Sequence, residues 1–403
     1  MIKITDKSKC CGCGACYNVC TSNAIAMQED IEGFLYPVIN AKFCIKCGLC
    51  LKVCPVIKVK DNRQTQNTVL EVYGAKNKNI EEQKLSSSGG MFSLLANYIL
   101  DNNGVVFGAG YNEKWEVVHT CIDNKESLDI LRRSKYVQSY IGNTLKKAKE
   151  FLDKDKYVLF VGTPCQIAGL KGFLNTDYNN LYCMDIFCHS VPSPKVWEMF
   201  LKQNFDIRDI NSIDFRNKDF GWEKSYLKIV LNNKKMYPYL PFYMKLITLF
   251  VPKKYHIKLL IGLYSLSFRK GFLASLYSRP SCHNCCFKGK QKQSDITVGD
   301  LWGIFEIAPH MYDKNGVSVI TVNSLKGRFL FEQIKNNLDF TIIDFDKMVK
   351  YNPYFLNSVG AHPKRQEFFD SYQTEPLNDL INRLLHKPFL KRCFNFLKNQ
   401  LKK

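Results

Sequence analysis

A duplicated cysteine motif at the start of the chain determines what this segment can fold around. The spacing C-x-x-C-x-x-C-x-x-x-C occurs twice in direct succession. Three thiolates at this spacing can reach three irons of one 4Fe–4S cubane, and the fourth cysteine ligates the other cubane. The repeat therefore predicts two 4Fe–4S clusters. The first would be held by Cys10, Cys13, Cys16 and Cys54, and the second by Cys44, Cys47, Cys50 and Cys20.

Structural zinc is the alternative occupant of such a cysteine set. Zinc sites favour paired C-x-x-C ligands and do not need the doubled register of eight cysteines, so clusters are the preferred interpretation. Cys11 has no place in the motif and is expected to be a free thiol. Thr21 follows Cys20 where proline is usual, which affects the turn but leaves the ligand in place.

The composition restricts the class of protein. The 403 residues include 46% hydrophobic and 23% charged residues, which is typical of a globular chain with room for a small and a large domain. Neither a signal peptide nor an apolar run long enough to cross a bilayer is visible. We therefore expect a cytoplasmic protein whose seventeen cysteines are reduced and serve as metal ligands or redox groups.

The motifs divide the chain into an α+β arrangement of two domains. Residues 1–58 are predicted to form a small ferredoxin-like domain with two 4Fe–4S clusters. A polar stretch at residues 59–69 is interpreted as a linker. Residues 70–379 are predicted to form a larger mixed α/β domain, and residues 380–403 a basic amphipathic tail.

Alternating patterns in the larger domain support this fold class. Short apolar runs at 72–75, 105–109 and 157–161 predict strands, and the apolar spacing at 91–100 and 167–173 predicts helices. Strands that alternate with helices indicate a mixed α/β sheet. The order of the strands within that sheet does not follow from these patterns.

Three small-residue turns are candidate ligand sites. The SSSGG turn at 86–90 precedes a helix and suits an anion, although one serine alone would serve as a plain N-cap. The GTPCQ turn at 162–166 follows a buried strand, where open α/β sheets place ligands, although Cys165 could be a small buried side chain. The GDLWG stretch at 299–303 offers Asp300 between glycines and is a weak signal alone.

Seven stretches together resemble the coenzyme F-420 hydrogenase/dehydrogenase beta-subunit family. They are SSSGGMFSLLANYIL at 86–100, RRSKYVQSYIG at 132–142, FVGTPCQIAGLKGF at 160–173, DIFCHSVPSPKVW at 185–197, FRNKDFGW at 215–222, RPSCHNCCFKGK at 279–290 and SDITVGDLWGI at 294–304. The ferredoxin-like front end matches the longer members of the family. The resemblance implies an iron–sulfur flavoprotein oxidoreductase that passes electrons between two-electron chemistry at FAD and 4Fe–4S clusters.

Carried over by motif, the resemblance also implies site residues. The flavin seat would comprise Ser87, Ser88, Gly89, Gly90, Lys135, Tyr136, Gln138, Thr163, Pro164, Gln166 and Asp300. A third 4Fe–4S cluster would be held by Cys165, Cys188, Cys282 and Cys285, with Cys286 as a substitute ligand. No catalytic residue is assigned, and a structural role is preferred for His189.

The substrate does not carry over from the resemblance. Deazaflavin, ferredoxin and a metabolite of a polysaccharide pathway stay open as electron donor or acceptor, and a hydrogenase- or dehydrogenase-type subunit is an expected partner. Two other functions are a non-catalytic electron-transfer adaptor and an accessory subunit in surface-polysaccharide biosynthesis. The SSSGG and GTPCQ turns favour the enzyme, because an adaptor needs no ligand seat.

Two acid-free segments account for the net charge of +20. Residues 224–294 contain fourteen lysines and arginines, and the chain after residue 379 contains seven more. The apolar, basic insert at residues 237–278 and the tail have three interpretations. They could lie on an anionic membrane surface, pack on the body, or dock an acidic redox partner such as a ferredoxin. No nucleic-acid-binding motif accompanies the charge, so a nucleic-acid partner is not expected.

Overall fold

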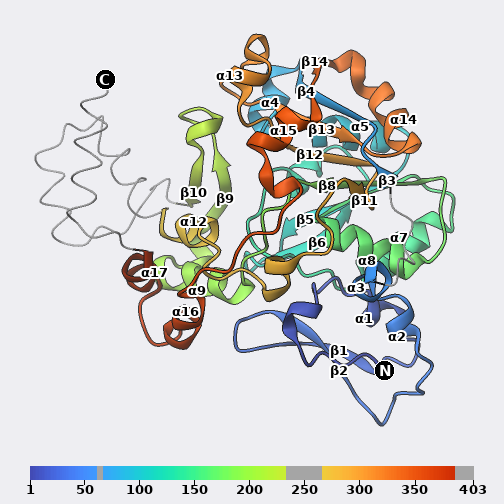
Figure 1. Ribbon diagram of the computed structural model, residues 1–403, viewed down its shortest axis with the longest axis vertical. Coiled ribbons are helices and arrows are strands. Elements are labelled where there is room, and N and C mark those ends of the chain that lie inside the picture. Colours follow the sequence, from blue (N-terminus) through green and yellow to red (C-terminus); the bar gives the residue numbers. More distant parts are fainter. Residues whose placement is uncertain (61–66, 233–265, 386–403) are drawn as a thin grey trace, which may run out of the picture.

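The computed structural model describes residues 1–60, 67–232 and 266–385, and its N-terminal unit repeats one local geometry twice (Figure 1). Gly14 and Gly48 have φ angles of 71° and 77°, a region that suits glycine, and each precedes a short helix that carries the next cysteine. An antiparallel hairpin completes the unit. Its elements are η1 (Lys7–Lys9), α1 (Ala15–Val19), β1 (Ile25–Glu29), β2 (Leu35–Ile39), α2 (Leu49–Lys52) and α3 (Pro55–Lys60).

The larger unit is built on an eight-stranded mixed sheet with the order β14-β4-β13-β12-β8-β7-β5-β6. The central strands β12, β8, β7 and β5 run parallel, and the strands on either side pair antiparallel. The bounds are β4 (Glu71–Asn77), β5 (Val105–Tyr111), β6 (Val117–Ile122), β7 (Val158–Gly162), β8 (Leu181–Ile186), β12 (Ile296–Asp300), β13 (Ser318–Val322) and β14 (Leu338–Ile342).

Helices cover both faces of this sheet because successive strand residues point to opposite sides. Val106 and Leu159 pack with α5 and α14 on one face, whereas Phe107 and Phe160 pack with α7 and α8 on the other. The helices around the sheet are α4 (Ile80–Leu85), α5 (Met91–Asp101), α6 (Leu128–Leu131), α7 (Thr144–Leu152), α8 (Pro164–Leu174), α13 (Ile304–Ile307), α14 (Leu325–Ile334) and α15 (Phe345–Tyr351).

A second apolar core lies beside the sheet, where a two-stranded hairpin packs with four helices (Figure 1). It contains α9 (Pro194–Asn204), β9 (Ile210–Asn217), β10 (Tyr226–Leu231), α12 (Leu266–Leu273), α16 (Arg365–Ser371) and α17 (Leu377–Leu385). Phe268 from the predicted basic insert and Leu380 at the start of the predicted tail are fully buried there. In their described parts, these two segments therefore turn apolar side chains to the body; residues 233–265 and 386–403 lie outside the described residues.

Short elements join these layers. They are β3 (Asn67–Thr68), β11 (Gln291–Lys292), η2 (Ile207–Asp209), η3 (Trp222–Lys224), η4 (Pro280–Asn284), η5 (Pro309–Met311), η6 (Lys335–Asn337) and η7 (Pro353–Phe355). Because α3 reaches Lys60 and β3 pairs with β11, both ends of the predicted 59–69 linker are in secondary structure. None of the helices in the described ranges has the length and apolar character needed to cross a membrane.

The predicted mixed α/β class and the ferredoxin-type front end are confirmed. All three predicted strands occur as β4, β5 and β7, and both predicted helices occur as α5 and α8. The helix predicted at 167–173 begins earlier, at Pro164, because Thr163 and Gln166 form a capping box at its start. The first turn of α8 therefore includes Cys165.

Candidate redox centre

The four cysteines predicted for the first cluster are neighbours. Burial raises the pKa of the Cys16 thiol to about 12, and the negative charges of Cys10 and Cys54 add to this effect. A hydrogen bond with Cys11 lowers the pKa of Cys13, but burial and the charges of Cys16 and Cys54 raise it above the usual value. Thiols held this close repel one another as bare thiolates, and coordination of iron removes that conflict. The set therefore fits a 4Fe–4S cluster.

The second set is more open to solvent. Cys20 and Cys50 lie in one small apolar cluster, and backbone N–H groups of Ala24 and Ile2 donate to their sulfurs at 3.3 Å. Cys44 is half-buried and Cys47 is exposed, both on the loop before α2. A cubane has its irons at separate corners, so its four cysteine ligands need not meet at one point.

A cavity of about 120 Å³ lies between the N-terminal unit and the sheet. Its walls include Pro164, His189 and Lys288. Six cysteines from four parts of the chain also line it: Cys11, Cys165, Cys188, Cys282, Cys285 and Cys286. The structure thus brings together all four ligands predicted for the third cluster, although they are separated by up to 120 residues in sequence.

Sheet topology explains how these cysteines meet. Strands β7 and β8 are parallel neighbours, so their carboxyl ends lie at the same edge of the sheet. Cys165 follows β7 in the first turn of α8, and Cys188 comes two residues after the end of β8. Cys282 lies in η4, and Cys285 directly follows it. Open α/β sheets place their ligands at this kind of edge.

The charges in the cavity fit a metal cluster. Burial raises the pKa of the Cys282 thiol to about 12, and the neighbouring Cys165 and Cys285 charges contribute. Burial also raises the pKa of Cys188, whereas the Lys288 ammonium opposes that shift. Lys9 and Arg279 also line the cavity, but the pKa values of these thiols stay raised, and bound iron would stabilise them as thiolates.

Cys11 has a place that the motif did not predict. Its thiol contacts both Cys13 and Cys165, so it lies between the first predicted cluster and the cavity. Cys286 is exposed, although it belongs to the same cavity wall. In the sequence, Cys11 is marked only by its position next to Cys10. Its contact with Cys165 could not be predicted, because it depends on the fold.

The SSSGG turn lies at the same sheet edge, beside β4 and β13. Ser88 Oγ donates to the Val317 carbonyl at 3.1 Å, and Ser318 Oγ accepts from Gly89 N at 2.9 Å. Ser87 Oγ accepts from Ser134 N at 2.8 Å. These hydroxyls therefore tie the turn to its surroundings, and Gly90 begins α5 with a φ of 88°. The backbone at the start of α5 is the part of this turn that could approach an anion.

Lys135 and Tyr136 stand next to the second core. Lys135 Nζ donates to the carbonyls of Arg132 and Ile130 at 2.7 and 3.2 Å. Burial lowers the pKa of Lys135 to about 7, and the nearby Arg133 charge acts in the same direction. The ring of Tyr136 stacks on Phe272, with 5.0 Å between ring centroids. Both side chains therefore make contacts within the protein that stabilise the fold.

Asp300 anchors the polar centre of this region. It ends β12 and pairs with Arg216, and both side chains are largely buried. Arg216 Nε and Nη2 have no hydrogen-bond partner in the described part of the chain. Burial opposes its charge, but the Asp300 carboxylate and the Tyr136 phenol raise the pKa of Arg216 above its usual value. Buried donors without partners are costly and mark a place where a ligand can accept hydrogen bonds.

Lys218 and two tryptophans complete this wall. Lys218 Nζ donates to the carbonyls of Gln83 and Asn315 at 2.6 and 2.7 Å. Burial lowers its pKa to about 8, and Arg216 adds to the shift. Trp222 and Trp302 have ring centroids 4.7 Å apart. The sequence stretch FRNKDFGW contains Arg216, Lys218 and Trp222, but none of them was assigned a role, because only the fold places them beside Asp300.

The remaining predicted seat residues lie on the cluster side. Gln138 Nε2 donates to the Cys11 carbonyl at 3.0 Å, and its Oε1 accepts from Arg279 at 2.8 Å. Gln166 caps α8 through Thr163 and donates to Ser139 at 2.9 Å, and Pro164 lines the cysteine cavity. The amide of Gln138 is therefore engaged at the interface between the two units. Of the eleven predicted residues, Pro164 lines the cavity, Gln138 bonds to the Cys11 carbonyl, and Tyr136 and Asp300 act on Arg216.

Comparison with known proteins identifies a domain in each of the two units. Residues 155–347 match the model of the carboxyl-terminal part of the coenzyme F420 hydrogenase/dehydrogenase beta subunit, and residues 9–57 match a 4Fe-4S dicluster domain. The chain is 27% identical over 227 residues to the F subunit of the F(420)H(2) dehydrogenase of Methanosarcina mazei, covering 52% of this chain and 63% of the relative.

Two relatives from Methanocaldococcus jannaschii show the same two parts. The chain is 28% identical to a coenzyme F420-dependent sulfite reductase over 58% of this chain and 38% of the relative. It is 32% identical to an uncharacterised ferredoxin over 16% of this chain and 91% of the relative. The chain spans less than two thirds of the length of the two larger relatives. The chain therefore carries the carboxyl-terminal domain of the coenzyme F420 hydrogenase/dehydrogenase beta-subunit family at residues 155–347 and a 4Fe–4S dicluster domain at residues 9–57.

Proposed function

We propose that the chain is an FAD-dependent iron–sulfur oxidoreductase with three 4Fe–4S clusters. The observation that carries this proposal is the six-cysteine cavity, which lies beside the dicluster unit at the sheet edge where Asp300 ends β12. The first two clusters would occupy the eight motif cysteines. The third would be held by Cys165, Cys188 and the Cys282/Cys285 pair, with FAD seated at the neighbouring part of the edge.

Bound FAD would exchange an electron pair with a substrate and single electrons with the clusters. The chain's own contribution is to hold these groups along one edge. The turn with Cys165 follows β7, Cys188 follows β8, and Asp300 ends β12, so three adjacent parallel strands deliver them in order. Arg216 and Lys218 supply positive charge where a flavin carries anionic or carbonyl groups. This order favours electron passage between the flavin seat and the dicluster unit through the cavity.

The proposed domain limits are the ones that the sequence suggested. Residues 1–58 form the dicluster domain, residues 59–69 the linker, residues 70–379 the flavin and third-cluster domain, and residues 380–403 the tail, whose first residues, up to Leu385, lie in α17. The contacts of α3 with α8 support a close association of the first and third parts. A partial digestion that releases an iron-containing fragment near residue 60 would support these limits.

A partner protein would exchange single electrons at the loop of the second cluster. Phe43 and Ile45 on this loop are 61% and 67% exposed, and Lys42 and Lys46 are exposed beside them. The stretch from Asn40 to Lys60 has no acidic residue. Apolar side chains ringed by lysines suit an acidic carrier such as a ferredoxin or an acidic component of a larger complex. The family name makes a hydrogenase or dehydrogenase subunit a natural candidate.

A non-catalytic electron-transfer adaptor is the second candidate. It is favoured by the hydroxyls of Ser87 and Ser88, which bind protein groups and leave only backbone N–H groups at that turn. The buried and unpartnered donors of Arg216 favour the flavoenzyme, because an adaptor would have no use for them. Flavin content separates the two candidates directly.

We expect the anaerobically purified chain to release one FAD on denaturation. The Arg216→Lys variant keeps a charge for Asp300 but removes the unpartnered guanidinium donors, so FAD should bind at least about tenfold more weakly, since a hydrogen bond to a charged group contributes about 1.5–3 kcal/mol. Arg208→Lys is the matched control, because Arg208 is exposed and pairs with Asp206. Titration of the flavin-free protein with FAD measures both affinities.

Absence of bound flavin after reconstitution with excess FAD would contradict the flavoenzyme and favour the adaptor. If FAD binds, reduced coenzyme F420 is the first donor to test, because both larger relatives are named for it. NAD(P)H and reduced ferredoxin follow as the other donors. Bleaching of the flavin absorbance identifies which of them reacts.

A further inference from the structure

Arg279 is a buried cation at the junction of the two units. It immediately precedes η4, the segment that carries Cys282, and its side chain is among the largest that are almost fully buried in the molecule. Nevertheless it reaches across to the N-terminal unit, 269 residues away in sequence. Neither the cluster assignment nor the flavin seat gives this residue a role.

Every nitrogen of the Arg279 guanidinium has a partner, and two of the contacts go to Cys10. Nε donates to the Cys10 carbonyl at 2.8 Å, and Nη2 contacts Cys10 Sγ at 3.7 Å. Nη2 also donates to the Leu35 carbonyl at 3.0 Å, and Nη1 donates to Gln138 Oε1 at 2.8 Å. The guanidinium lies over the Tyr36 ring, 4.4 Å from its centroid. These contacts hold the guanidinium beside Cys10.

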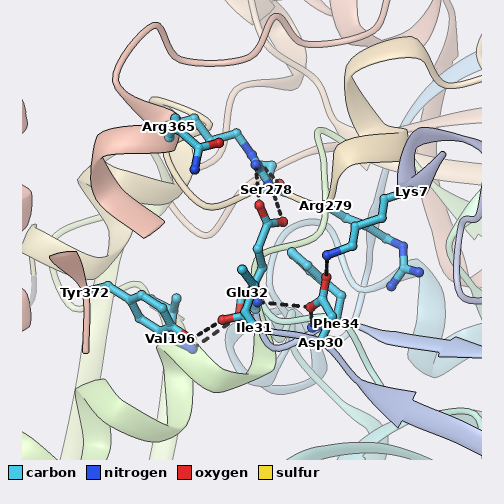
Figure 2. A network of polar contacts seen from close by, with 12 residues as sticks. Lys7, Asp30, Ile31, Glu32, Phe34, Val196, Ser278, Arg279, Arg365 and Tyr372 are labelled. Carbon is cyan, nitrogen blue, oxygen red and sulfur yellow. Dashed lines mark hydrogen bonds and ion pairs between the residues drawn. The ribbon is translucent and has the colours of Figure 1, made fainter. Parts of the chain in front are cut away.

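The charge of Arg279 is balanced by sulfur. The nearby carboxylates form ion pairs with other cations: Glu32 pairs with Arg365, and Asp30 pairs with Lys7. Figure 2 shows both pairs, with Arg279 directed away from them. The groups with the largest electrostatic effect on Arg279 are the side chains of Cys10, Tyr36, Cys11 and Cys282. A buried charge needs a counter-charge, and Cys10 would supply it as a thiolate ligand of the first cluster.

We propose that Arg279 raises the reduction potential of the first cluster. A hydrogen bond to a ligand sulfur and an adjacent positive charge both stabilise the reduced cluster, which carries one more negative charge. Arg279 donates a hydrogen bond to the sulfur of Cys10, a ligand of the first cluster, whereas its effect on Cys282 is electrostatic. The first cluster is therefore the one that it favours for the electron. Only the direction of electron flow in this inference rests on the proposed function. The first cluster itself belongs to the dicluster domain, so its midpoint can be measured independently.

A purely structural role for Arg279 can be separated from this one. The same hairpin is held by contacts that touch no cysteine: Arg365 donates to both Glu32 oxygens at 2.6 and 2.8 Å, and Tyr372 Oη donates to the Ile31 carbonyl at 2.5 Å. Figure 2 shows these contacts at the turn of the hairpin. The Arg365→Gln variant thus weakens the same interface without removing charge from the cluster.

The test is a redox titration of the full chain with reconstituted clusters, followed by electron paramagnetic resonance. In Arg279→Gln we expect the midpoint of the first cluster to fall by about 59 mV or more, a tenfold change in its oxidised-to-reduced ratio. Arg279→Lys should fall less because it keeps the charge. In Arg365→Gln the midpoint should stay at the wild-type value.

An unchanged midpoint in Arg279→Gln would overturn the proposal, and so would an equal shift in Arg365→Gln. If Arg279→Gln loses the first cluster, the midpoint is measured in a fully loaded Arg279→Lys protein instead. A wild-type midpoint in Arg279→Lys together with a shifted midpoint in Arg365→Gln overturns the proposal. A lowered midpoint in Arg279→Lys together with an unchanged midpoint in Arg365→Gln supports the proposal. Failure of the proposed function would appear separately, as missing FAD and missing iron of the third cluster, while the dicluster signals remain.

Discussion

At the scale of single residues, the chemistry of the proposed flavin seat depends on buried cations. Arg216 is held by Asp300, whereas Lys218 is held only by carbonyl oxygens. Burial and the Arg216 charge lower the pKa of Lys218 to about 8, which is below the usual lysine value near 10.4. The folded chain therefore binds this proton less tightly than the unfolded chain does.

This pKa shift predicts a pH dependence of stability. Between about pH 8 and 10.4 the unfolded chain holds the Lys218 proton and the folded chain has released it, so the free energy of unfolding gains a contribution that rises with pH. The contribution is complete above the unfolded pKa and is lost as the pH falls to about 8. Urea denaturation at pH 8 and pH 10 should show this rise in the wild type and a smaller one in Lys218→Met. Equal slopes would refute the shift.

At the scale of elements, helix α8 connects the clusters to the sheet through two glycines. A Cβ on Gly169 would lie 2.6 Å from Cys13 Cβ, and one on Gly172 would lie 2.4 Å from the Val53 carbonyl oxygen. The two glycines are three residues apart and share one face of the helix. Their missing side chains let α8 approach both cysteine loops of the dicluster unit.

We expect Gly169→Ala to destabilise the protein, although alanine is the better helix former by about 1 kcal/mol. The added methyl group would meet the backbone-linked Cβ of Cys13, which cannot rotate away, so the loop of the first cluster must shift. The expected readouts are a lower thermal midpoint and a changed spectrum of the first cluster. Gly360→Ala is the control, because a Cβ there meets nothing within 4 Å. A Gly169→Ala protein as stable as the wild type would show that the loop accommodates the methyl group.

At the scale of the whole molecule, one edge of the eight-stranded sheet carries Cys165, Cys188 and Asp300, whereas the eight motif cysteines lie in the N-terminal unit. The eight motif cysteines and the mixed α/β class could be predicted from spacing and local patterns, because both are encoded over a few residues. The contacts of Arg279 with Cys10 and of Asp300 with Arg216 could not, since they join segments 269 and 84 residues apart. The family resemblance identified Cys165, Cys188 and Cys282, but only the strand order shows why they meet.

The central claim is that the body holds its own cluster beside the dicluster unit. Iron per chain tests it most directly, measured with protein concentration after anaerobic reconstitution. Three cubanes predict about twelve irons in the wild type and about eight in Cys188→Ser. Cys121→Ser should keep the full amount, because Cys121 lies in β6 and does not line the cavity. About eight irons in the wild type, with no loss in Cys188→Ser, would contradict the third cluster.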